Sequence, residues 1–125
     1  NLSNLDNLLK LYDYKVAGVT HPFGYFGMWK STVSWHVVDM DLGSINVVHS
    51  GAPKLWYIVS SEHGKKFEDL CRKMFPQRAT TCQAFLRHKD CLIGPKLLQE
   101  YDIPYTKIIQ NAGEIVVGKL SQNLI

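Results

Sequence analysis

Trp35-His36-Val37-Val38-Asp39-Met40-Asp41 is the stretch that decides the fold class of this 125-residue chain, together with the segments on either side of it. Aromatic and β-branched residues, which favour strands, fill residues 25–38, 44–49 and 54–59. Turn-forming residues separate these segments, with Gly43 before the second and Pro53 before the third. The pattern predicts a succession of short strands.

Helical patterns flank and interrupt the predicted strands. Leucines recur at three- and four-residue steps over residues 2–12, which predicts an amphipathic helix. A second helix is predicted over 62–75, with Ser61 as its N-cap and Pro76 after its last residue. A short third helix is predicted over 95–101, because Pro95 suits a first helical position.

Two further strands are predicted at 107–110 and 114–117, on either side of the turn Asn111-Ala112-Gly113. Residues 118–125 offer neither a strand partner nor a helix cap. Many short strands with inserted helices favour a mainly β fold, a partial double-stranded β-helix or jelly roll. The remaining sequence is too short to complete its eight strands.

Composition and charge exclude several classes of protein. The chain is 46% hydrophobic, as in a globular domain, and it has no apolar run of about 18 residues, so we expect no membrane span. Its net charge of +3 would help association with chromatin, but it is too weakly focused to predict sequence-specific DNA binding, and a weak basic bias of this kind is usually only a solvated surface. Three cysteines without a CxxC pair favour a reducing compartment. Asn1, in place of an initiator methionine, indicates a start inside a longer protein.

His36 begins a candidate metal-binding strand. Side chains at positions i and i+2 of a strand share a face, so His-x-Asp or His-x-Glu brings an imidazole and a carboxylate to one metal. A second histidine from a distant strand would complete the triad of a non-haem Fe(II) oxygenase. Here Val38, which has no lone pair, holds position i+2, and Asp39 lies on the opposite face of an ideal strand. A packed, hydrogen-bonded histidine is the competing interpretation.

Blocks of sequence around this strand form a longer pattern. They are Gly24-Tyr25-Phe26-Gly27-Met28-Trp29-Lys30-Ser31-Thr32, Trp35-His36, Asp39-Met40-Asp41-Leu42, Ser44-Ile45-Asn46, Gly51-Ala52-Pro53-Lys54-Leu55-Trp56-Tyr57, Glu62-His63-Gly64-Lys65, Ala84-Phe85-Leu86-Arg87-His88-Lys89, Ile103-Pro104 and Ala112-Gly113-Glu114. Together they resemble the JmjC histone lysine demethylases, most closely the subfamily that acts on trimethyl-lysine. The resemblance covers about residues 18–117 and leaves a tail, 118–125. We therefore expect residues 1–125 to form a partial JmjC domain with a cupin-like jelly-roll fold.

The resemblance implies an iron site and a 2-oxoglutarate site. His36 matches the first iron ligand, and Val38 replaces the carboxylate of the family. The second histidine of the family follows a strand that starts at the Ala-Gly-Glu block, and we expect it to be absent because the sequence leaves the pattern after Val117. Lys54 matches the lysine that pairs with the distal carboxylate of 2-oxoglutarate, and Asn46 matches an asparagine near the cosubstrate. Without this context, Lys54 would be an ordinary exposed lysine.

The resemblance also implies a substrate pocket and a zinc site. Gly18 and Tyr25 match positions that line the methylammonium pocket, where a ring edge and oxygens surround the cation. Tyr25 as a core aromatic is an equally open interpretation. Cys82 and His88 match two ligands of a structural zinc site that needs four. The other two belong to a C-terminal segment outside this sequence, so we expect a half site and no Zn(II) binding.

At the level of the family, the resemblance implies oxidative N-demethylation of methylated histone lysines in the nucleus, with Fe(II) and 2-oxoglutarate. The incomplete iron triad predicts that this chain is inactive. One alternative is a non-catalytic pseudo-oxygenase that holds a methylated histone tail or another chromatin partner near Tyr25. A second is an incomplete gene model or splice product that does not fold stably. The sequence does not determine which methylated lysine is recognised.

Overall fold

The computed structural model describes residues 6, 11, 15–38, 42–118 and 123–124. They belong to two compact units, Asn1–Ser31 and Thr32–Ile125, and each unit is described by itself. The amphipathic helix expected over 2–12 lies almost entirely outside the described residues and stays a prediction.

The first unit turns sharply at Gly18. This residue has φ +80°, and its backbone N–H donates to the His21 carbonyl at 2.8 Å. A Cβ at position 18 would lie 2.6 Å from the ring of Phe23. Glycine is therefore required at position 18 for two reasons: the positive φ, and the lack of space for a Cβ beside the ring of Phe23.

The strand predicted over 25–38 is wrong for most of its length. Only β1 (His36–Val37) is a strand within that range. A turn interrupts the segment, because the Ser31 N–H donates to the Met28 carbonyl at 3.0 Å and Lys30 has φ 65°. Aromatic content alone predicted a strand here, but strand formation also needs a neighbour to hydrogen-bond, which local sequence does not report.

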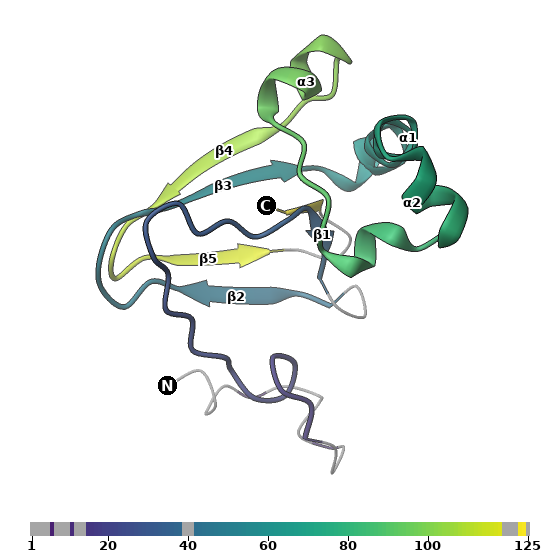
Figure 1. Ribbon diagram of the computed structural model, residues 1–125. Helices are drawn as coiled ribbons and strands as arrows, with labels where there is room; N and C mark the ends of the chain where they lie inside the picture. The colour runs from purple at the N-terminus through teal and green to yellow at the C-terminus, as the bar shows by residue number, and fades with distance from the viewer. Residues whose placement is uncertain (1–5, 7–10, 12–14, 39–41, 119–122, 125) are drawn as a thin grey trace. The chain divides into compact units, whose positions relative to one another are not determined.

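The second unit contains two antiparallel sheets (Figure 1). In the described residues, the larger sheet has four strands in the order β1, β6, β3, β4, and the smaller one pairs β2 with β5. The strands not yet given are β2 (Ser44–Val47), β3 (Lys54–Val59), β4 (Thr106–Gln110), β5 (Ile115–Gly118) and β6 (Asn123–Leu124). This arrangement confirms the mainly β, jelly-roll-like class with inserted helices.

The chain passes between the two sheets twice at the same end of this unit (Figure 1). Residues 48–53 lead from β2 to β3, and residues 111–114 lead from β4 to β5. The two connections are hydrogen-bonded to each other: the Gly113 N–H donates to the Val48 carbonyl at 2.7 Å, and the Val48 N–H donates to the Glu114 carbonyl at 3.4 Å. This end is the corner at which one sheet is attached to the other.

The tail of the chain corrects a second expectation. Residues 118–125 were predicted to have no strand partner, yet Gly118 ends β5 and β6 lies between β1 and β3. In the register of β6, His36 stands opposite Leu124, and Val59 opposite Asn123. Two strand edges left unpaired would expose rows of backbone donors and acceptors, and β6 satisfies both. Such a partner cannot be recognised from the tail sequence alone.

Helical segments follow β3. In order they are η4 (Ser61–His63), α1 (Gly64–Met74), α2 (Pro76–Thr81), η5 (Phe85–His88) and α3 (Pro95–Glu100). The helix predicted over 62–75 is therefore divided, and Ser61 is the first residue of η4 rather than an N-cap. His63 holds the N-cap position of α1. Pro76 ends one helix and, because proline suits a first helical turn, also begins α2. Within the described residues, no helix has both the length and the apolar character needed to cross a membrane.

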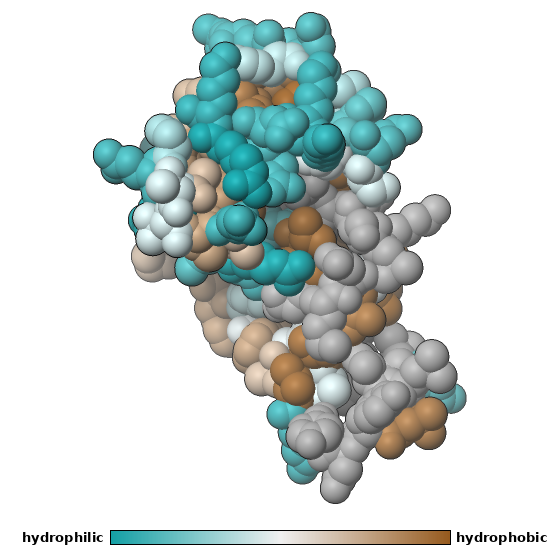
Figure 2. Space-filling model, turned by 90° about the vertical axis from the view of Figure 1, so that its right-hand side faces the viewer, coloured by the Kyte–Doolittle hydropathy of each residue, from teal (hydrophilic) through white to brown (hydrophobic). Residues whose placement is uncertain are grey.

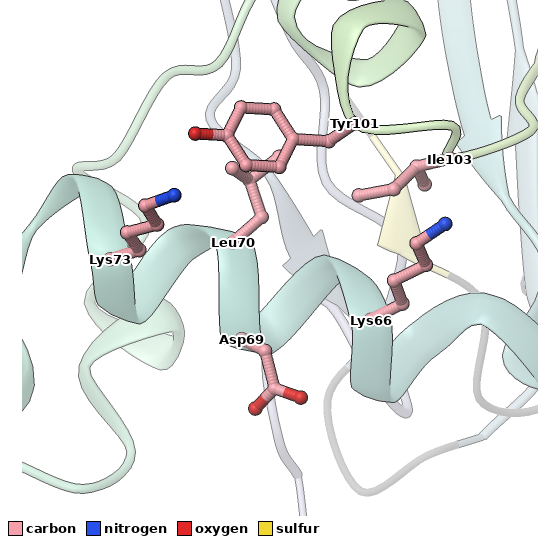
Figure 3. Close-up of a pocket in the computed structure, with 6 residues that line it drawn as sticks. All are labelled: Lys66, Asp69, Leu70, Lys73, Tyr101 and Ile103. Atoms are coloured by element: carbon pink, nitrogen blue, oxygen red, sulfur yellow. The ribbon is translucent and has the colours of Figure 1, made fainter.

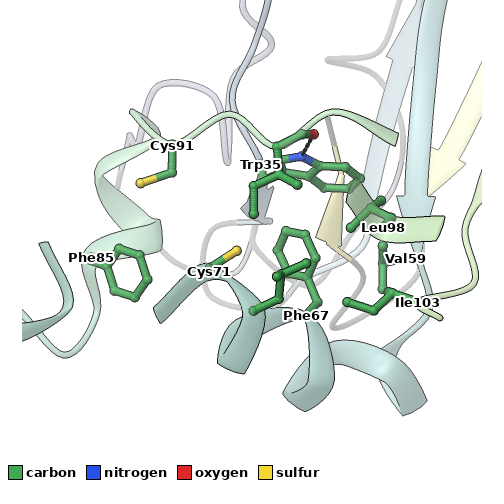
Figure 4. Packing of buried hydrophobic residues seen from close by; sticks show 10 residues of the cluster. Trp35, Val59, Phe67, Cys71, Phe85, Cys91, Leu98 and Ile103 are labelled. Carbon is green, nitrogen blue, oxygen red and sulfur yellow. Dashed lines mark hydrogen bonds between the residues drawn. The ribbon is translucent and has the colours of Figure 1, made fainter. Parts of the chain in front are cut away.

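The core of the second unit lies between β3 and the helical segments (Figure 4). Phe67, Leu70 and Cys71 of α1 are buried there. Trp35 is 1% exposed; its ring centroid lies 4.9 Å from that of Phe67, and its Nε1–H donates to the Ile93 carbonyl at 2.8 Å. The opposite side of the helices is mostly hydrophilic, as Figure 2 shows over the helical part of this unit.

Candidate metal and cosubstrate site

His36 is half-buried on β1, and its ring is held by the backbone. Nδ1 lies 2.9 Å from the Ser34 carbonyl oxygen. A proton on Nδ1 would be donated to that carbonyl and would leave the lone pair on Nε2. Metal-ligating histidines are commonly oriented in this way by a hydrogen bond from the other ring nitrogen. The geometry therefore fits a ligand, as well as a packed histidine.

A residue without a donor atom stands where a further ligand would be needed. Val38 follows β1 directly and is two residues beyond His36, and valine offers no lone pair. In the antiparallel pair of β1 and β6, position 124 is the backbone partner of His36. This pairing could not be predicted from the sequence, because the tail carries no clear strand signal.

The described residues do not fit a facial triad for Fe(II). Among them, no group of three or more histidine, cysteine, aspartate or glutamate side chains comes together. Asp39 and Asp41 lie outside the described residues. No catalytic step through iron is derived for this chain.

Lys54 and Asn46, the predicted cosubstrate residues, belong to different sheets. Lys54 is the first residue of β3; it is half-buried, and Nζ lies 4.1 Å from the centroid of the Trp56 ring. Burial lowers the pKa of its ammonium group, because desolvation disfavours the charged form. Asn46 is half-buried on β2 and pairs with Val116 of β5. A carboxylate that approached Lys54 would meet a partly desolvated cation.

The side chain of Gln110 connects the strands of these two residues. Its Oε1 accepts a hydrogen bond from Trp56 Nε1 at 2.8 Å. Its Nε2 donates to the carbonyl oxygens of Asn46 and Glu114, at 2.9 and 3.0 Å. No sequence motif pointed to Gln110. The one available signal was a glutamine at the end of a strand otherwise rich in isoleucine.

Cys82 and His88, the predicted half of a zinc site, lie at the two ends of a short stretch around η5. Cys82 is the C-cap of α2 and is half-buried, whereas His88 ends η5 and is exposed. Cys91 is buried elsewhere in the core, with Sγ 3.4 Å from Asp90 Oδ1. The half-site assignment stays a prediction.

Gly18 and Tyr25, the predicted substrate residues, belong to the first unit. The ring of Tyr25 packs edge-on against Phe23, with 6.1 Å between centroids, and the residue is 75% exposed. This exposure disfavours the interpretation of Tyr25 as a core aromatic of its unit. The methylammonium pocket itself stays a prediction.

A surface pocket lies apart from the cosubstrate residues (Figure 3). It is lined by Lys66, Asp69, Leu70, Lys73, Tyr101 and Ile103. Lys66 Nζ donates to the Asp102 carbonyl at 2.8 Å, and Lys73 Nζ lies 4.8 Å from the centroid of the Tyr101 ring. Its cations are thus already engaged with groups at its own rim.

Comparisons with known proteins identify the class to which this fold and these residues belong. Residues 23–118 match the family described as "JmjC domain, hydroxylase". The chain belongs to the JmjC family, whose domain is a cupin-like jelly roll, and the predicted family and fold class are confirmed.

The chain is also similar in sequence to several lysine-specific demethylases. The chain is 46% identical over 121 residues to the probable lysine-specific demethylase 4F of Homo sapiens, covering 94% of this chain and 19% of that protein. The same identity over 121 residues relates it to lysine-specific demethylase 4B of Mus musculus, covering 94% and 11%. It is 52% identical over 102 residues to lysine-specific demethylase 4D of Rattus norvegicus, covering 82% and 20%. The chain thus spans 11% to 20% of the length of these relatives.

Proposed function

We propose that this chain is a degenerate member of the Fe(II)- and 2-oxoglutarate-dependent histone lysine demethylases, present in the nucleus and associated with methylated histone tails. Its identity of 46–52% to lysine-specific demethylases supports the class of reaction. In that class, bound iron supplies the oxygen activation that removes an N-methyl group by oxidation. We further propose that residues 1–125 form part of one JmjC domain.

The predicted site residues would have separate binding roles. Lys54 and Asn46 would hold and orient the 2-oxoglutarate, the lysine through a charge-assisted contact with the distal carboxylate. His36 would be a protein ligand for iron. Gly18 and Tyr25 would surround the methylated ammonium group. Cys82 and His88 would provide two of the four ligands that a closed zinc site needs.

We propose that the chain itself does not turn over substrate, and one observation carries this. His36 has a valine at the i+2 position, where the metal strand of an Fe(II) oxygenase carries a carboxylate. An imidazole without that carboxylate competes poorly with water for Fe(II). The proposed contacts to the methylated lysine and to the cosubstrate do not use position 38.

The test of this function measures product directly. The chain is incubated with Fe(II), ascorbate, 2-oxoglutarate and a trimethyl-lysine histone peptide, and formaldehyde and succinate are quantified against a boiled control. We expect neither product above the control. Formation of both in stoichiometric amounts would show that the chain is an active demethylase despite Val38.

A second function, non-catalytic binding of a methylated histone tail, is favoured by the exposed ring of Tyr25. It needs no iron, because ring edges and oxygens can surround a methylated ammonium group directly. Methylated and unmethylated peptides are compared by fluorescence anisotropy, with Tyr25→Ala as the variant and Tyr105→Ala as an aromatic control in the second unit. Equal affinity for both peptides would reject this function.

A further inference from the structure

Gln110 is a buried amide at the corner where the two sheets meet. It is the last residue of β4 and is 1% exposed, and it stands opposite Lys54 in the register of β3 and β4. Among the residues that the structure describes, Gln110 is the one polar residue that is buried. A buried amide without partners costs free energy, so its hydrogen bonds have to be made.

The three hydrogen bonds of Gln110 reach both sheets. Its Oε1 binds the indole N–H of Trp56 on β3, and its Nε2 binds the Asn46 carbonyl on β2 and the Glu114 carbonyl after the turn. Because one side chain makes all three, the distance between β3 and β2 cannot change at this corner without breaking one of them. Gln110 therefore acts as an inter-sheet clamp.

The clamp lies beside the cation of the cosubstrate site. Lys54 Nζ lies 4.1 Å from the ring centroid of Trp56, the same indole whose N–H binds Gln110. The backbone of Asn46 is held directly. Gln110 thus contacts the support of Lys54 on one sheet and the strand of Asn46 on the other, while His36 takes no part in these contacts.

We propose that Gln110 is the positioning residue of a metal-independent dicarboxylate site, in which Lys54 and Asn46 bind a short dicarboxylate such as 2-oxoglutarate. This inference rests on the cosubstrate assignment in the proposed function, but not on iron binding or turnover. The cation, the strand of the asparagine and the clamp between them are all present in a chain that has valine at the carboxylate position of the metal strand. The chain consequently binds the cosubstrate without processing it.

The test is a calorimetric titration, in which 2-oxoglutarate is added to the chain in metal-free buffer and the heat of binding is measured. The monocarboxylate 2-oxobutanoate, which lacks the distal carboxylate, is the comparison ligand. We expect binding of 2-oxoglutarate only, loss of binding in Lys54→Ala, and a weakening of about tenfold in Gln110→Met, which keeps the volume and removes the hydrogen bonds. Gln77→Met, at an exposed position of α2, is the matched control and should bind as the unmodified chain does.

A second variant, Gln110→Glu, separates positioning from a general loss of structure. In the Gln110→Glu variant, the carboxylate would still accept from Trp56 but would face the Asn46 and Glu114 carbonyls without a proton to donate, so the clamp would open and binding would be lost. Once protonated, the carboxyl group regains a donor. Its burial raises its pKa, and 2-oxoglutarate affinity should therefore recover as the pH falls from about 8 to about 6. The unmodified chain should show no such recovery.

The outcomes are distinct. If the unmodified chain does not bind 2-oxoglutarate, both the cosubstrate assignment and the clamp are wrong. If it binds and Lys54→Ala does not, but the folded Gln110 variants bind normally, the cosubstrate site stands and the inference about Gln110 is overturned. If circular dichroism shows that both Gln110 variants are unfolded at every pH, Gln110 is structural only and the inference is likewise overturned.

Discussion

At the scale of the residue, the predicted metal site depends on the side chains at positions 36 and 38. His36 has a backbone hydrogen bond of the kind that orients a ligating ring, with Nδ1 2.9 Å from the Ser34 carbonyl oxygen. Position 38 carries valine. Substitution of a donor by an aliphatic side chain of similar size preserves packing while it removes the lone pair. Chemistry and fold are therefore separable at these positions.

The first prediction concerns these positions. Val38→Glu should bind Co(II), a spectroscopic substitute for Fe(II), more tightly than the unmodified chain, because positions 36 and 38 share a face of an extended strand and the variant adds a carboxylate beside His36. Visible absorption of the Co(II) complex is the measurement, and Val37→Glu, which places the carboxylate on the opposite face, is the control. Equal spectra for the two variants would mean that position 38 does not belong to the site of His36.

At the scale of the element, α1 stabilises the second unit through one buried face. Phe67, Leu70 and Cys71 lie on it, three and four residues apart, which places them on one side of the helix. The thiol of Cys71 is completely buried, and burial, with smaller effects from Cys91 and Glu68, raises its pKa to about 12. Its chemistry is therefore controlled by whether α1 is packed against the sheet.

The second prediction follows from this pKa. The folded value lies above the ordinary value of 9.0, so the folded state retains the proton longer than the unfolded state. The contribution of this group to stability is complete below pH 9.0 and is lost as the pH rises toward about 12. Urea unfolding across this range should show a steeper fall in the free energy of unfolding for the unmodified chain than for Cys71→Ala. Parallel curves would contradict the buried thiol.

At the scale of the whole molecule, contacts between distant segments join the helices to the sheets. Trp35 precedes β1, yet its indole N–H binds the carbonyl of Ile93, just before α3. Gln110 likewise connects Trp56 with Asn46. The bonds donated by Trp35 and Trp56 are buried, where an unpaired polar group is costly. They select one arrangement of segments that hydrophobic packing alone would leave less defined.

The third prediction tests the first of these contacts. Trp35→Phe removes the indole donor and leaves the Ile93 carbonyl unpaired in the core, so it should lower the free energy of unfolding by about 1–3 kcal/mol. Trp29→Phe is the matched control, since Trp29 is 86% exposed and should change stability by less than about 0.5 kcal/mol. Denaturation in urea measures both. A similar loss in the two variants would show that the buried hydrogen bond contributes nothing specific.

Local patterns in the sequence were sufficient for much of this architecture. Lys54–Val59 and Pro95–Glu100 were predicted nearly as they are, because their strand and helix signals lie within a few residues. The blocks around His36 also determined the family, and Val38 predicts that one iron ligand of the family is replaced. These features depend on residue type and short spacing, which any reader of the sequence has in full.

Only the tertiary structure decided the rest. The segment before Trp35 forms a turn instead of a strand, β6 places Leu124 opposite His36, and Gln110 joins two sheets. Each of these depends on which backbone groups find partners far away in the sequence. A strand exists only where another strand pairs with it, and a polar side chain acquires a role only through the groups that surround it. Residue identity determined what the site had lost, whereas long-range hydrogen bonding determined what the remaining residues can hold.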